Sequence, residues 1–199
     1  MITTMNYTEQ PEREKIIRSK KMMMWFGIIS LSMMFAGLTS AYIVSKERRD
    51  WLADFELPQA FYISTAIIIL SSITLHISKI SVKKENFQPA KILTLVTAAL
   101  GVAFMVFQFR GFDEMFAQGY YPTGDQSTIN TSFIYIFVVT HIAHLLAGIV
   151  VLTVVLIQLF RNKYTEGETL GFDLATTFWH FVDFLWIYLL VFLLISPSL

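Results

Sequence analysis

The sequence predicts an all-α fold, a polytopic membrane helix bundle with five transmembrane helices, and three observations support this prediction. Of the 199 residues, 55% are hydrophobic and only 15% are charged, against roughly 45–50% and about 25% in soluble domains. Five long stretches are apolar on every side, whereas a soluble helix carries a one-sided apolar stripe. All fifteen Lys and Arg residues lie outside these stretches.

Each of the five apolar stretches is long enough to cross a bilayer. A hydrocarbon core of roughly 30 Å requires about 20 apolar residues in a helix. The predicted spans are residues 22–44, 59–78, 92–109, 133–160 and 174–195. Because a 199-residue globule cannot bury five such helices on every side, the alternative of a soluble helical protein is rejected.

The remaining residues form short segments around one membrane domain. Residues 1–21 are polar and charged, so we expect a cytoplasmic N-terminal segment and no signal peptide. Residues 22–199 are expected to form the five-helix membrane domain. The longest connection spans residues 110–132 and contains residues typical of turns. These turn-forming residues are Gly111, Gly119, Pro122 and Gly124.

The distribution of basic residues predicts the orientation in the membrane. Eleven of the fifteen Lys and Arg residues fall in the N-terminal segment and in the second and fourth connections, and four fall on the opposite side. Cytoplasmic loops carry the excess of Lys and Arg. The sequence therefore predicts a cytoplasmic N-terminus and a C-terminus outside, which agrees with an odd number of spans.

Composition excludes several kinds of function. The formal net charge is zero, so the chain lacks the basic excess that drives nucleic-acid binding. It has no cysteine, which excludes disulfides, thiol chemistry and Cys-ligated metals. No phosphate-binding glycine loop or nucleophile motif is present, so no catalytic residue is expected.

Few ionisable side chains remain inside the predicted spans, and these are the candidates for function. They are His76, His141, His144, His180 and Asp183. His141 or His144 facing His180 would allow ligation of a haem or metal, with Asp183 as an orienting carboxylate. Alternatively, the same residues form a hydrogen-bonded interhelical network, in which Asp183 accepts from His180, a Trp or a Tyr. His76 lies near a helix end, where no special role is expected.

Two motifs resemble one known family. Residues 179–186 read W-H-F-V-D-x-x-W, which resembles the final helix of cytochrome c oxidase subunit III. Residues 140–148 resemble that family's T-x-H-x-x-H-x-x-x-G region, with a shortened Thr–His spacing. Residues 107–112 and 34–42 are similar to further segments of the family. Leu31 stands where the family commonly has a carboxylate, so no proton-related role is assigned to that position.

The resemblance implies the short, five-helix form of subunit III. It implies an accessory, non-redox subunit of a proton-pumping aa3-type haem–copper oxidase in a bacterial plasma membrane, acting in aerobic respiration. Haem and copper would reside in partner subunits I and II, and this chain would pack on subunit I and bind phospholipid. A respiratory supercomplex is a further possible partner. The residues then implied as a structural network or subunit interface are His141, His144, Trp179, His180, Asp183 and Trp186.

Two other functions remain open from the sequence. One is subunit III of a quinol oxidase, because the electron donor binds to another subunit. The other is a haem-binding redox membrane protein that uses His141 or His144 with His180.

Overall fold

A computed structural model of the chain describes residues 9–48, 51, 57–124, 127–161, 164 and 169–196. The described residues form five α-helices and one short 3-10 helix, with no strand among them. The helices are α1 (Glu9–Val44), α2 (Gln59–Lys83), α3 (Phe87–Ala117), α4 (Ile129–Phe160) and α5 (Leu170–Ile195), and the 3-10 helix is η1 (Ser45–Glu47). All five α-helices are long and apolar enough to cross a membrane. The predicted fold class is therefore confirmed.

The helices extend beyond the predicted spans, because polar residues at a membrane surface continue the helical conformation without adding apolar character. α1 begins at Glu9 and therefore includes much of the predicted N-terminal segment. α3 runs on to Ala117, so the prediction of a turn at Gly111 is wrong. The helix ends at Ala117 and the chain turns at Gly119, whose φ of 82° is left-handed. Tyr120 N donates to Met115 O at 2.9 Å in the usual closure of a helix C-terminus.

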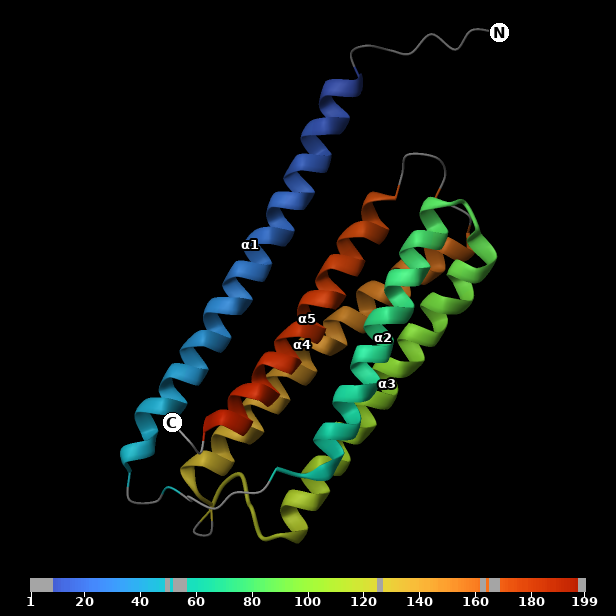
Figure 1. The fold of residues 1–199 in the computed structure, drawn as a ribbon. Helices are drawn as coiled ribbons and strands as arrows, with labels where there is room; N and C mark the ends of the chain where they lie inside the picture. The colour runs from blue at the N-terminus through green and yellow to red at the C-terminus, as the bar shows by residue number, and fades with distance from the viewer. Residues whose placement is uncertain are drawn as a thin grey trace, which may run out of the picture.

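α5 occupies the central position in the bundle. α2 and α3 form a long antiparallel hairpin, α4 packs against α3 and α5, and α5 packs against α2, α4 and α1. Figure 1 shows α1 on one side of α5 and the α2–α3 hairpin on the other, with the first turns of α1 projecting beyond the remaining helices. α5 is accordingly the element through which the other helices are joined.

The contact of α1 with the bundle is anchored at its C-terminal end. The Tyr42 hydroxyl lies 3.2 Å from the Ser196 hydroxyl, and the Lys46 ammonium group donates to the Ser196 carbonyl at the end of α5. Lysine is favourable there because carbonyl groups at a helix C-terminus carry partial negative charge. The Tyr42 ring also packs against Trp51 and Phe192. This end of α1 is fixed, whereas its apolar side chains nearer the N-terminus, including Trp25 and Phe26, are exposed.

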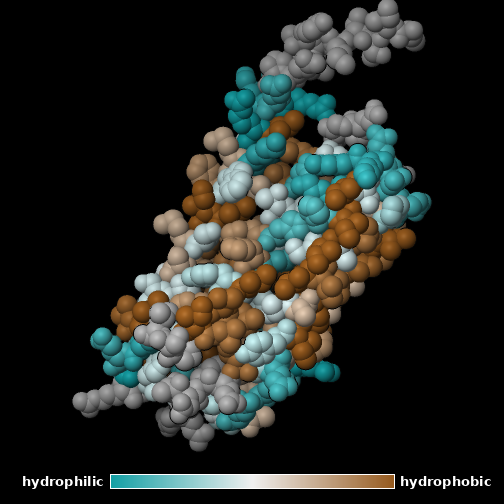
Figure 2. All heavy atoms as spheres, viewed as in Figure 1, coloured by the Kyte–Doolittle hydropathy of each residue, from teal (hydrophilic) through white to brown (hydrophobic). Residues whose placement is uncertain are grey.

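The surface pattern agrees with a membrane-spanning bundle. In Figure 2, hydrophobic residues dominate the middle of the visible face and hydrophilic residues gather toward its ends. One hydrophilic area extends from the N-terminal end of α1 inward over the region between α1 and α2, where Figure 1 places α5. Polar side chains on a membrane helix mark sites of function or of helix association.

Candidate functional site: a polar seam between α2 and α5

A continuous set of polar and aromatic side chains lines the contact between α2 and α5, and we call it the α2–α5 seam. Its members come from facing sides of the two helices: Thr65, Ser71, Ser72, His76, Lys79, Asp173, Trp179, His180, Asp183 and Trp186. Ser72, His76 and Lys79 of α2, and His180, Asp183 and Trp186 of α5, are three or four positions apart, which places each set on one face of its helix. The seam combines four of the six predicted network residues with hydroxyl groups of α2.

The two tryptophans of the seam are hydrogen-bonded to hydroxyl groups. Trp179 Nε1 donates to Ser71 Oγ at 3.1 Å, and Trp186 Nε1 donates to Thr65 Oγ1 at 2.9 Å. Both indole rings are about 1% exposed. The expectation that a Trp donates to Asp183 is therefore wrong for the residues that the structure describes. Hydroxyl groups of α2 accept the hydrogen bonds of both indole N–H groups.

His180 faces α2 and not α4. Its Nδ1 atom lies 2.6 Å from Ser72 Oγ, and its ring centroid is 6.0 Å from that of His76. Asp183, one helical turn further along α5, is 3% exposed, and neither carboxyl oxygen has a hydrogen-bond partner among the described residues. The Ser72 hydroxyl lies near the Asp183 carboxyl without forming a hydrogen bond to it. Ser72 thus stands between the two ionisable groups.

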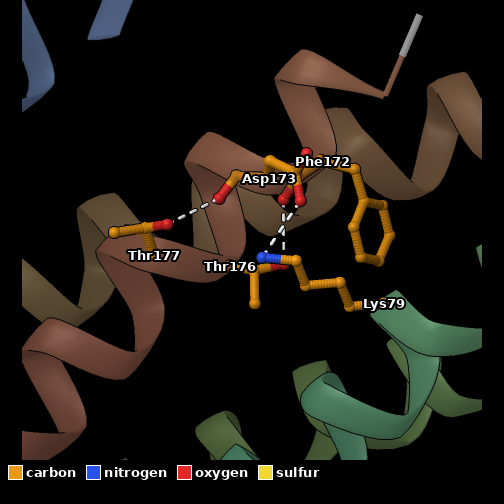
Figure 3. Close-up of polar contacts among 5 residues, drawn as sticks. All are labelled: Lys79, Phe172, Asp173, Thr176 and Thr177. Carbon is orange, nitrogen blue, oxygen red and sulfur yellow. Dashed lines mark hydrogen bonds and ion pairs between the residues drawn. The ribbon is translucent and has the colours of Figure 1, made fainter. Parts of the chain in front are cut away.

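The seam ends in an ion pair at the end of α2. Lys79 Nζ lies 3.0 Å from Asp173 Oδ1, as Figure 3 shows, and Thr177 Oγ1 donates to the Asp173 carbonyl at 2.8 Å. Because the two side chains are 25% and 35% exposed, water screens the pair, and such pairs contribute roughly 0–1 kcal/mol to stability. The pair therefore lies at the end of the seam and adds little to the stability of the fold.

The two histidines of α4 are not members of the seam, and they contact different residues. His141 is fully buried against the rings of Trp186 and Phe104, at centroid distances of 5.1 and 5.8 Å. Neither His141 ring nitrogen has a hydrogen-bond partner among the described residues. His144 Nδ1 lies 2.7 Å from the Thr140 carbonyl, and its ring packs on Phe35 of α1.

This arrangement does not assemble the paired-histidine site that one interpretation of the sequence requires. His180 has its partners on α2, while His141 packs against rings of α3 and α5 and the half-buried His144 packs on one ring of α1. Within the part of the chain that the structure describes, no three His, Cys, Asp or Glu side chains gather in a way that could hold a metal ion. The structure therefore does not bring His180 together with His141 or His144, the pair on which that interpretation depends.

Sequence reasoning missed the hydroxyl partners, although the sequence contains a signal for them. Ser64, Ser71 and Ser78 recur every seven residues along α2, and all three are fully buried. Gln108 Nε2 donates to Ser64 Oγ at 2.9 Å, and Ser78 Oγ lies 2.8 Å from Thr94 Oγ1. A seven-residue repeat of small polar residues in a membrane helix indicates a face that packs on other helices.

Replacing Ser71 with alanine is expected to lower the free energy of unfolding by about 1 kcal/mol. The substitution leaves the buried Trp179 N–H without an acceptor, and interhelical hydrogen bonds in membrane proteins contribute on this scale. Unfolding of the purified chain in mixed detergent micelles would measure the change. Ser81→Ala is the matched control, because the Ser81 hydroxyl bonds only to the Ile77 carbonyl of its own helix. Equal stability of the two variants would contradict the prediction.

Comparison with known proteins identifies similar sequences. The family model for cytochrome c oxidase subunit III matches residues 50–197. Cytochrome c oxidase subunit 3 of Thermostichus vulcanus is 29% identical over 84% of this chain and 83% of its own length. The protein of that name from Corynebacterium diphtheriae is 28% identical over 91% of each chain. Subunit 3 of the cytochrome bo(3) ubiquinol oxidase of Pseudomonas aeruginosa is 28% identical over 82% of this chain and 78% of its own length.

Proposed function

Because the chain belongs to the cytochrome c oxidase subunit III family, whose model matches residues 50–197, we propose that it is an accessory, non-redox subunit of a proton-pumping aa3-type cytochrome c oxidase. It is a multi-pass membrane protein and a subunit III of a haem–copper oxidase. The match to the family carries the proposal. The separation of His180 from the α4 histidines supports a role without a redox centre in this chain.

In this proposal the helix bundle packs beside subunit I and has a structural role. Haem and copper lie in subunits I and II, and this chain supplies contacts, fixed helix geometry and phospholipid binding. The apolar, exposed side chains of α1, such as Phe26 at 66%, support association with lipid or a neighbouring subunit. The residues that serve as its structural network or subunit interface are His141, His144, Trp179, His180, Asp183 and Trp186.

The proposed location is a bacterial plasma membrane, with the N-terminus in the cytoplasm and the C-terminus outside. Two observations support it. Bacterial oxidase subunits align along most of the chain, and the sidedness of Lys and Arg follows the positive-inside rule. In this orientation, the Lys79–Asp173 pair and the N-terminal turns of α1 face the cytoplasm. Residues 1–21 then form the cytoplasmic segment, and residues 22–199 form one membrane domain.

Tagged chain extracted from its native membrane in mild detergent is expected to purify together with oxidase subunits I and II. The check is identification of the associated polypeptides by mass spectrometry, together with haem and copper analysis of the complex. A helix-bundle membrane protein of unrelated function from the same membrane serves as the control. Purification of the chain without subunit I, or with a haem absorbance band that His180→Ala abolishes in the isolated chain, would contradict the proposal.

A quinol oxidase is the second candidate complex, and the similarity to the Pseudomonas aeruginosa bo(3) subunit favours it at nearly the same level of identity. The two candidates differ in subunit II, where the electron donor binds. Copper bound to the co-purified subunit II would indicate a cytochrome c oxidase. A subunit II without copper, in a complex that oxidises quinol, would indicate the alternative.

A further inference from the structure

Three hydrogen-bonding atoms of α5 remain without a partner at the middle of the seam. They are Nε2 of His180 and both carboxyl oxygens of Asp183, in the part of the chain that the structure describes. An ionised carboxylate buried without a partner is costly, and the cost falls when the group binds a proton. The neighbouring side chains offer a hydroxyl and an imidazole, groups that both give and accept protons. These atoms therefore form a set suited to holding a proton.

The side chains of the seam become more exposed from Asp183 as far as His76. Asp183 is buried, His180 and Ser72 are half-buried, and His76 is exposed. His76 lies seven residues before Lys83, the last residue of α2, which corresponds to about 10 Å along the helix axis. His180 and Ser72 thus lie between the buried carboxyl and the end of α2 that carries the Lys79–Asp173 pair. Figure 2 shows hydrophilic residues extending inward from the same end over the region of α5.

Among the described residues, the charged and titratable groups with a contact at this site lie on α2 and α5. α2 contributes His76 and Lys79, which both interact with His180. α5 contributes Asp183 itself and Asp173, which is paired with Lys79 at 3.0 Å. Lys79 is thus partly neutralised by its partner, and in the described part of the chain Asp183 forms no ion pair. By contrast, His141 is enclosed by aromatic rings and has no such route.

We propose that the Asp183 carboxyl is a proton-binding site, loaded from the aqueous phase at the Lys79–Asp173 end of the bundle through His180 and Ser72. The ligand is a proton, and the site exchanges it with water. The short contact between His180 Nδ1 and Ser72 Oγ, at 2.6 Å, provides the central step. Asp183 lies three residues beyond His180 on the same face of α5, and in the last step the Ser72 hydroxyl turns toward its carboxyl, to which it forms no hydrogen bond at rest.

The transfer balances without any redox partner. A proton that enters from the His76 side binds the buried Nε2 of His180, and Nδ1 releases its own proton to Ser72 Oγ. The Ser72 hydroxyl proton then moves to a carboxylate oxygen of Asp183. The imidazole remains neutral in its other tautomer, the carboxylate becomes a neutral acid, and no electron moves. The reverse sequence releases the proton and restores the first tautomer.

The test is infrared difference spectroscopy of the purified complex that contains the full chain, after exchange from H2O to D2O. We expect a carbonyl stretching band of a protonated carboxyl that shifts in D2O and is absent from the Asp183→Asn variant. Asp113→Asn removes an exposed carboxyl at the opposite end of the bundle and is expected to leave the band unchanged. Persistence of the band in Asp183→Asn, or no such band in the wild type, would overturn the proposal.

The rate of exchange tests the route separately from the site. Ser72→Ala and His180→Phe are expected to slow the D2O shift of the band by about tenfold or more, since each interrupts a proton-transfer step. Ser81→Ala is the control and keeps the wild-type rate. Unchanged rates in both seam variants would overturn the route, and these variants remain informative if Asp183→Asn fails to assemble. The spectra do not depend on the electron donor, so the result is independent of the proposed oxidase type.

Discussion

Replacing Trp179 with alanine is expected to lower the free energy of unfolding by about 3–5 kcal/mol, the cost of removing a large, fully buried aromatic side chain. Trp179 is about 1% exposed and lies on α5 at the centre of the bundle. Its truncation removes van der Waals contacts with three other helices at once. In a bilayer, where the apolar surroundings provide no hydrophobic drive for helix association, such packing is a main source of stability.

The glycines around Trp179 show how closely the helices approach its ring. A methyl carbon on Gly101 of α3 would lie 2.7 Å from Trp179 Cη2. One on Gly148 of α4 would lie 3.3 Å from Cε3 of the same ring. The indole N–H meanwhile donates to Ser71 of α2. The surrounding backbones are therefore shaped to the indole, and they cannot collapse freely into the space that alanine would leave.

Unfolding of the purified chain in mixed micelles would measure the loss, with Phe184→Ala as the matched control. Phe184 lies on the same helix but is 66% exposed, so its truncation removes little packing. Trp179→Phe keeps an aromatic ring but removes the hydrogen bond to Ser71. We expect its loss of stability to lie between those of Phe184→Ala and Trp179→Ala. Equal losses for Trp179→Ala and Phe184→Ala would contradict the central position of Trp179.

The sequence was sufficient to predict the number and approximate position of the membrane helices. Length and apolarity decide this, because about 20 apolar residues are needed to cross the hydrocarbon core. The helix ends were missed for a related reason. Residues 110–117 are less apolar than the span before them, yet they continue α3, since a helix that has left the hydrocarbon core keeps its backbone hydrogen bonds.

The partners inside the bundle were harder to predict, because the spans are apolar on all sides and so do not reveal which face packs inward. His141 and His144 share a helix face, yet the first packs on Trp186 and the second on Phe35 of α1. The two side chains differ by a small rotation about the axis of α4, and the composition of the span does not reveal which neighbour each one contacts. The hydroxyl acceptors were predictable in principle, since the serines of α2 recur every seven residues. A hydroxyl oxygen accepts hydrogen bonds as a carboxylate oxygen does, so the indole N–H groups are paired without Asp183.

The second large effect is expected at Gly111, where alanine should lower the free energy of unfolding by about 1–3 kcal/mol through overpacking. A methyl carbon at this position of α3 would overlap the ring of Phe61, with its Cδ1 atom at 2.8 Å. Phe61 is fully buried and packs edge-on against Trp186, at a centroid distance of 5.9 Å. The ring therefore has no free space into which it can turn.

We expect a displaced Phe61 ring to disturb the seam as well, because Phe61 packs against Trp186. Trp186 in turn donates to Thr65, one turn beyond Phe61 on α2. Gly27→Ala is the matched control, since a methyl group there would meet no heavy atom within 4 Å. The control should gain up to about 1 kcal/mol, because alanine favours a helix over glycine.

A second variant distinguishes overlap with Phe61 from a general effect of the methyl group. Combining Gly111→Ala with Phe61→Leu should recover part of the lost stability, since residues in direct contact couple in a double-mutant cycle. Strictly additive losses would show that the methyl group and the Phe61 ring do not compete for the same space. The close approach of α3 to α2 at Gly111 would then not be what positions Phe61 and Trp186.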